Sequence, residues 1–132
     1  MCEILFRGKR VDNGEWVKGF YVCVLDTHYI MTGKFDSLTN GIINSEAYKV
    51  DLNTIGRFTG LTDKNGRKIF EGDIVKYNGD PGHVEFDKEN AEFLIFFRKW
   101  NAGFDSIYCD RNAEVIGNIH DNPELLEVSG NE

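Results

Sequence analysis

Residues 56–77 have the sequence GRFTGLTDKNGRKIFEGDIVKY, which combines strand-forming segments with strong turn signals. Asn65-Gly66 is a favoured pair for a two-residue type I′ turn, in which both central residues take positive φ. Apolar residues flank the pair on both sides, so we expect two strands joined by a tight hairpin. Glu71-Gly72-Asp73 interrupts the second strand, and the β-branched and aromatic residues at 74–77 favour a third. A glycine at this break would let the chain turn the corner of a small barrel.

The same turn signal recurs along the whole chain. Asn-Gly occurs four times, at Asn13-Gly14, Asn40-Gly41, Asn65-Gly66 and Asn78-Gly79. Around these turns the pattern predicts further strands at 4–6, 16–25, 83–86, 92–100, 105–109 and 114–119. Helix is scarce, and the best candidate is one short C-terminal turn at 122–127, where Pro123 suits the first helical position. The chain is therefore expected to be mainly β.

Three blocks of the chain carry a resemblance to a known family. Residues 55–77, with 6–17 upstream and 114–126 downstream, resemble the YopX family of small bacteriophage and prophage proteins. The resemblance implies a C-terminal SH3-like β-barrel behind an N-terminal β-rich hairpin region, and it implies no activity and no catalytic residue. The expected domains are therefore the β-rich region at 1–54 and the SH3-like barrel with its closing helical turn at 55–128. The tail at 129–132 should fray.

Composition and charge restrict the function classes. The 132 residues carry 22 acids against 15 bases, a net charge of −7, and residues 57–132 hold 15 of the acids. This balance opposes generic binding to phosphate backbones and favours solubility. The sequence has no apolar run of the roughly 20 residues that a membrane helix needs and no charged-then-apolar leader. The expected location is the cytoplasm of a bacterial host, with no membrane partner.

The cysteines predict reduced thiols rather than a disulfide framework or a metal site. Cys2, Cys23 and Cys109 are odd in number, and no two of them form a C-x-x-C motif. Cys23 and Cys109 each lie in an apolar strand segment, so we expect both to face the core. Zinc would need further close-spaced Cys or His ligands, and neither a metal nor another cofactor is predicted.

The sequence contains no catalytic constellation, so an enzyme is not expected. His28, His83 and His120 are far apart, and none of the serines lies in a nucleophile elbow. A glycine-rich phosphate loop with a lysine is also missing. The least favoured hypothesis is a small hydrolase or nuclease that uses Glu71, Asp73 or His83.

Two carboxylate groups have both a structural and a functional interpretation. Asp63 begins a segment that faintly resembles a calcium loop, but a hairpin turn explains it better. Glu71 and Asp73 would share a strand face if the chain stayed extended, whereas fixing the turn is the simpler role. An acidic stretch could bind a cation weakly or face a partner, although a solvated surface is favoured. Its members are Asp80, Glu85, Asp87, Glu89 and Glu92.

Aromatic residues beside basic ones form the candidate binding surface. It consists of Arg7, Lys9, Arg10, Trp16, Arg98 and Trp100. The consecutive apolar residues 93–97 also predict a strand that is covered on both faces, by the barrel core on one and by the N-terminal region or a second subunit on the other. The leading hypothesis is a non-enzymatic phage or prophage accessory protein that binds another protein of the host or phage. The alternative is a single-stranded nucleic-acid-binding module that uses the same six residues.

Overall fold

The computed structural model describes residues 4–36, 38, 41–77, 79–89, 91–97, 102–104 and 113–126. Within these residues the chain is mainly β, with antiparallel pairing throughout and only two 3-10 turns as helix, which confirms the predicted class. The chain divides into two compact units, Met1–Phe58 and Thr59–Glu132.

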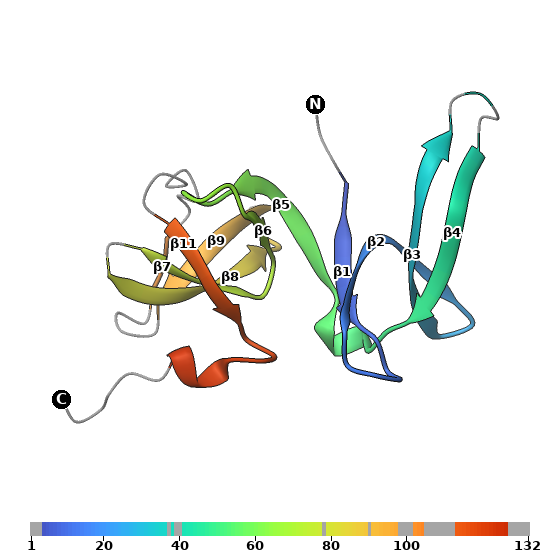
Figure 1. The fold of residues 1–132 in the computed structure, drawn as a ribbon. Coiled ribbons are helices and arrows are strands. Elements are labelled where there is room, and N and C mark those ends of the chain that lie inside the picture. Colours follow the sequence, from blue (N-terminus) through green and yellow to red (C-terminus); the bar gives the residue numbers. More distant parts are fainter. Residues whose placement is uncertain are drawn as a thin grey trace. The chain divides into compact units, whose positions relative to one another are not determined.

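The first unit is an antiparallel sheet that begins with a hairpin, as predicted. Its strands are β1 (Phe6–Lys9), β2 (Trp16–Val24), β3 (Thr27–Asp36), β4 (Gly41–Lys49) and the first part of β5 (Gly56–Thr62), with the 3-10 turn η1 (Leu52–Thr54) before β5. The strand order is β4-β3-β2-β1-β5 (Figure 1). Strand β2 changes partner along its length, since residues 16–19 pair with β1 and residues 20–24 pair with β3.

The β2–β3 turn has a backbone conformation that its residues do not favour. Leu25 and Asp26 both take positive φ, 48° and 64°, as the two central residues of a type I′ turn do. The strand predicted at 16–25 ends at Val24, so the predicted boundary at Leu25 is wrong. No Asn-Gly signal marks this turn; the pairing of Val24 with Thr27 imposes it. The strained conformation costs on the order of 1–2 kcal/mol per non-glycine residue.

This strain supports a prediction about stability. Replacing Asp26 by glycine is expected to raise the free energy of unfolding by about 1 kcal/mol, because glycine takes positive φ without a steric penalty. Urea unfolding followed by circular dichroism measures the change. The control is Thr27→Gly, one position further into β3, which should lower stability by about 0.5–1 kcal/mol. Equal effects of the two glycines would contradict the turn assignment.

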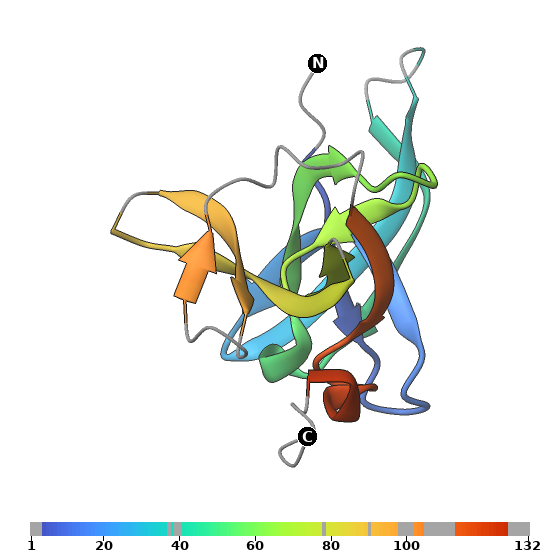
Figure 2. The same ribbon diagram turned by 90° about the vertical axis from the view of Figure 1, so that its left-hand side faces the viewer.

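The second unit contains the end of β5 and six more strands. These are β6 (Lys68–Phe70), β7 (Asp73–Tyr77), β8 (Asp80–Asp87), β9 (Glu92–Phe97), β10 (Ala102–Phe104) and β11 (Ala113–Asn118), followed by the 3-10 turn η2 (Pro123–Leu126). Strand β6 pairs with β5, and the other five form a sheet in the order β10-β9-β8-β7-β11. Figure 2 shows β8 and β9 as a curved hairpin, coloured from olive-yellow to orange.

The described strands of this unit do not close into a barrel, because β10 and β11 are the edges of the five-stranded sheet. The predicted closing turn at 122–127 is present as η2. The predicted strand at 105–109 lies outside the described residues, and so do residues 98–100 at the end of the expected strand 92–100.

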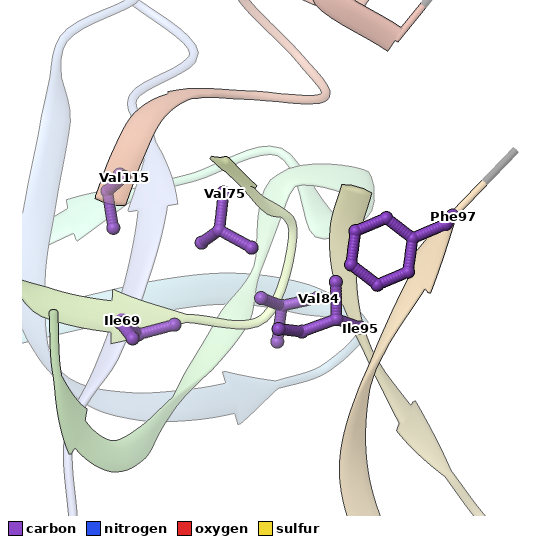
Figure 3. Close-up of a cluster of buried hydrophobic side chains, with 6 residues drawn as sticks. All are labelled: Ile69, Val75, Val84, Ile95, Phe97 and Val115. Atoms are coloured by element: carbon purple, nitrogen blue, oxygen red, sulfur yellow. The ribbon is translucent and has the colours of Figure 1, made fainter. Parts of the chain in front are cut away.

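The core of the second unit brings together β6, β7, β8, β9 and β11. Its six buried side chains are Ile69, Val75, Val84, Ile95, Phe97 and Val115, and Figure 3 shows them directed into one common space. Strand β9 alternates as a half-buried strand should, since Ile95 and Phe97 are buried while Leu94 and Phe96 on the opposite face are half-buried. The apolar run 93–97 therefore supplies core residues from one face only.

The β5–β6 hairpin forms as predicted, but its turn type differs from the prediction. Asp63 N donates to Arg67 O, and Gly66 N donates to Asp63 O, so the loop has three residues. Gly66 takes a φ of 81°, whereas Asn65 is not among the positive-φ residues, and the two-residue type I′ turn is therefore wrong. The cause is the Asp63 carboxylate, whose Oδ1 accepts from Asn65 N at 2.9 Å and Arg67 N at 2.8 Å. Asp at the first position and Gly at the fourth suit this longer loop.

The same carboxylate links the hairpin to β11. Asp63 Oδ2 accepts from Val115 N at 2.9 Å, and the neighbouring Lys64 N donates to Ala113 O at 3.0 Å. Burial by itself raises the pKa of Asp63, but the three backbone donors outweigh burial and hold the pKa below its usual value. Because all three donors are backbone groups, Asp63 fixes the turn, as the hairpin interpretation predicted, and it also fixes the edge of β11, which was not predicted.

The chain turns a corner between β6 and β7, where a glycine was expected to permit it. Gly72 has a φ of 91°, and its N–H donates to Val84 O at 2.8 Å. Asp73 is buried, and its Oδ2 accepts from Phe70 N across the corner at 2.7 Å. Asp73 therefore fixes the turn rather than sharing an extended strand face with Glu71.

Candidate functional site

The first unit gathers part of the predicted binding surface on one face of its sheet. Lys9 and Trp16 are cross-strand partners, and Arg7 lies two residues before Lys9 on β1, so all three side chains share a face. The Arg7 guanidinium carbon is 4.8 Å from the centre of the Trp16 ring, and Lys9 Nζ is 5.8 Å from it. These distances are typical of cation–π contacts. The indole is therefore already in contact with cations of its own sheet.

Arg10 lies apart from this group. Its guanidinium is 4.4 Å from the centre of the Tyr48 ring, and its Nε and Nη2 donate to the Asp12 carboxylate at 2.9 and 2.6 Å. The hydrogen bond from Arg10 lowers the pKa of Asp12, and the same bond raises the pKa of Arg10. The charge of Arg10 is thus matched by a neighbouring acid. Arg98 and Trp100 lie outside the described residues.

An apolar surface continues from the Trp16 group along the same face. We name it the β2–β3 apolar face and define it by residues that alternate along β2 and by their partners on β3: Phe20, Val22, Val24, Tyr29 and Met31. Phe20 is 49% exposed and Val24 52% exposed, and the adjacent turn residue Leu25 is 94% exposed. The opposite face of the sheet contains the buried Ile30, and Gly8 on that face lies against Val50. The first unit therefore covers one face of its sheet and exposes apolar side chains on the other.

The residue pattern predicts this face only in part. It grouped Trp16 with the basic run, but it did not identify Val24 or Met31 as surface residues. The available signal was in residues 16–24, where both alternating sets of positions contain apolar residues. A strand that is apolar on both faces is stable when both faces are packed against other residues, and this unit packs only one of them.

The residues of the hydrolase hypothesis are not brought together. Ile74 is the cross-strand partner of His83, so the preceding residue Asp73 is placed on the opposite face of the sheet from His83. His83 Nε2 is 2.8 Å from Glu85 Oε2, and the His83 ring is 5.6 Å from Phe96. Its Nδ1 is buried and has no hydrogen-bond partner among the described residues.

Two members of the acidic stretch in the second unit make local hydrogen bonds. Glu85 contacts His83, and Asp87 Oδ1 accepts from Glu89 N at 3.0 Å. The described part of the chain contains no group of three or more His, Cys, Asp or Glu side chains arranged to hold a metal ion. No helix there has the length and apolar character that crossing a membrane requires.

One cysteine prediction is wrong. Cys23 is exposed rather than directed into the core. Strand β1 pairs with residues 16–19 of β2, and Cys23 lies further along, in the part of β2 that pairs with β3. Cys2 and Cys109 lie outside the described residues.

Comparison with known proteins gives a family and a related structure. A family model described as YopX protein matches residues 5–127. Among solved structures, the chain is similar to the crystal structure of protein EF1440 from Enterococcus faecalis, with 26% sequence identity and a TM-score of 0.57. That match covers 96% of this chain and 100% of the other. A search of curated proteins gave no match.

Proposed function

The chain belongs to the YopX family, and we propose that it is a non-enzymatic phage or prophage accessory protein that binds another protein in the cytoplasm of a bacterial host. The observation that supports this proposal is the β2–β3 apolar face. Contiguous exposed apolar side chains, bordered by polar ones, are typical of surfaces that bind proteins. Phe20 and Tyr29 are aromatic residues of the kind that contribute most to binding energy.

The charges around this face define the chemistry of the partner. Among the described side chains that are not buried, those with a charge at strand positions on this side of the sheet are Lys9, Lys18 and Lys49, and all three are cationic. The surface that fits is therefore a protein surface with an apolar centre and an acidic rim, because complementary charges favour association and discriminate against wrong partners. A second copy of this chain is an alternative occupant that the experiment below separates.

The second unit supports the proposal as a scaffold. We propose that it is an SH3-like barrel, with the β5–β6 turn bound to the edge of β11 through Lys64 N, Asp63 Oδ2 and the β11 backbone. An experimental structure in which strand hydrogen bonds close the ring would support this fold. A ring that stays open between β10 and β11 with the whole chain traced would contradict it.

Matched surface variants test the binding function. Val24 and Leu52 are both aliphatic and are 52% and 54% exposed, but Leu52 lies in η1, outside the β2–β3 apolar face. We expect Val24→Asp and Phe20→Asp each to weaken partner binding by roughly 30-fold, because a buried interface residue contributes about 2 kcal/mol or more. Leu52→Asp should bind as the unchanged protein does. The protein is captured from host lysate with its partner, and affinity is then measured with the two purified components.

Several outcomes would contradict the proposal. Equal binding by Val24→Asp and Leu52→Asp would place the interface elsewhere, and repeated failure to retain any partner would count against protein binding. If sedimentation shows that the unchanged protein is a dimer and that Val24→Asp is a monomer, the β2–β3 apolar face binds a second copy of this chain. Oligonucleotide binding that weakens steeply with salt, and is lost in Lys9→Glu, would replace the proposal with the single-stranded nucleic-acid function.

A further inference from the structure

Two of the four Asn-Gly pairs lie in described turns, and they match each other closely in backbone structure. Asn13-Gly14 and Asn65-Gly66 are both exposed, and their glycines take positive φ of 74° and 81°. The N–H of each glycine donates to a backbone carbonyl of its own turn at 3.0 Å. The space where a Cβ of either glycine would lie is open. The other two asparagines, Asn40 and Asn78, lie outside the described residues.

The side chains of the two described asparagines differ in how they are held. Asn13 Oδ1 accepts from Glu15 N at 2.9 Å, and Asn13 Nδ2 donates to Glu15 Oε1 at 3.2 Å. Asn65 donates to Asp63 Oδ1 through its backbone N–H, but its side chain makes no hydrogen bond within the described part of the chain. The Asn65 carboxamide can therefore rotate toward the backbone nitrogen that follows it. The Asn13 carboxamide must break two hydrogen bonds to do the same.

This rotation has a chemical consequence when glycine follows asparagine, because glycine has no Cβ to hinder attack by its backbone nitrogen. We propose that Asn65 is a deamidation site of the folded protein and that it reacts faster than Asn13. Gly66 N gives its proton to a base in the solvent and forms a bond to Asn65 Cγ. The bond from Cγ to Nδ2 then breaks, and Nδ2 takes up a proton and leaves as ammonia.

Water completes the reaction by opening the cyclic imide at either of its carbonyl groups. The product is aspartate or isoaspartate, and in isoaspartate the backbone runs through the β-carbon. Water is the only further reactant, and no oxidant or reductant takes part. The site therefore needs no enzyme, metal or cofactor.

The modification changes the turn that Asp63 holds. Isoaspartate at position 65 adds a carbon atom to the backbone of the loop. Asp63 Oδ1 accepts from Asn65 N and from Arg67 N, which lie on opposite sides of that added atom. The longer loop moves these two donors apart, and Lys64 N in the same loop donates to the backbone of β11. Isoaspartate should therefore loosen the link between the β5–β6 hairpin and β11.

Peptide mapping by mass spectrometry of the full chain, aged in mildly alkaline buffer, tests the proposal. The Asn65 peptide should deamidate about tenfold faster than the Asn13 peptide, because only Asn13 must first break two exposed hydrogen bonds. Glu15→Ala removes one of these two acceptors, so it should speed the reaction at Asn13 and leave Asn65 unchanged. Equal rates at the two sites, or a faster reaction at Asn13, would overturn the proposal.

Ageing in concentrated urea separates the effect of the fold from that of the sequence. Both peptides should then react at about the same rate, because the bonds to Glu15 exist only in the folded chain. An Asn65 peptide that is converted in urea but stays unmodified in buffer would also overturn the proposal.

Asn65→Gln tests the effect on the turn, because the longer side chain forms the cyclic imide much more slowly. Ageing should lower the urea midpoint of the unchanged protein more than that of Asn65→Gln. Asn13→Gln is the control and should lose as much stability on ageing as the unchanged protein does. Equal losses in the unchanged protein and Asn65→Gln would contradict the loosening of the turn.

Discussion

Replacing Asp63 by alanine is expected to lower the free energy of unfolding by about 4 kcal/mol, because three backbone N–H groups lose a charged acceptor. The carboxylate is buried and accepts from Asn65, Arg67 and Val115. Without it, these donors have no replacement acceptor except water that enters the site. Thermal and urea unfolding measure the loss. Lys64→Ala in the same turn is the control and should change stability by less than about 0.5 kcal/mol, because its 3.7 Å ion pair with Glu114 is exposed.

The asparagine variant separates the two roles of Asp63. Asp63→Asn keeps one oxygen, which can serve Asn65 and Arg67, but its amide nitrogen then faces the donor Val115 N. We expect a loss of about 2 kcal/mol, with the hairpin intact and the link to β11 broken. Full stability in Asp63→Asn would contradict a structural role for that link.

The stabilisation by Asp63 should also depend on pH. Its pKa lies below the usual value in the folded chain, so the unfolded chain binds the proton more readily. The stabilisation is fully present above the unfolded value of about 3.9 and is lost as the pH falls through the lower folded value. The stability difference between the unchanged protein and Asp63→Asn should therefore shrink on acidification below about pH 4. A difference that stays constant would contradict the charged acceptor.

Replacing Phe97 by alanine is expected to cost about 4 kcal/mol of unfolding free energy, because its large ring is buried in the second unit's core. Phe97 is 2% exposed and packs with Ile95 and Val84 (Figure 3). Phe96 is the matched control, since it is the same residue type one position earlier in β9 and lies half-buried on the opposite face. Phe96→Ala should cost only about 1–2 kcal/mol, because partly exposed atoms lose less on removal.

Urea unfolding of the two phenylalanine variants under identical conditions gives this comparison. Equal losses would mean that both faces of β9 are equally covered, as expected from the sequence for a strand between two layers. A larger loss of stability for Phe96→Ala than for Phe97→Ala would contradict the assignment of Phe97, rather than Phe96, to the core face of β9. Phe97→Leu tests how much of the loss comes from the removed volume. Because leucine fills more of the space than alanine, this variant should lose less than half of the stability that Phe97→Ala loses.

The amino-acid sequence by itself determined the local structure of this protein. Strand-forming residues, glycines at positive φ and the single turn at Pro123 act between residues close together in the chain, so their pattern predicted the β class, the β5–β6 hairpin and the corner at Gly72. The blocks shared with the YopX family are of the same kind. They are continuous segments, and the match to residues 5–127 confirmed what they indicated.

Only the tertiary structure decided which side chains meet. The donor to Asp63 Oδ2 is 52 residues away, and the turn at Leu25 and Asp26 is imposed by the pairing of β2 with β3. The exposure of Cys23 also became apparent only in the folded chain. The cation–π contacts of Arg7 and Lys9 with Trp16 also depend on the register between β1 and β2, which the sequence alone does not give. The physical reason is that alternation fixes which residues share a strand face, but the register and length of the neighbouring strands decide what that face contacts.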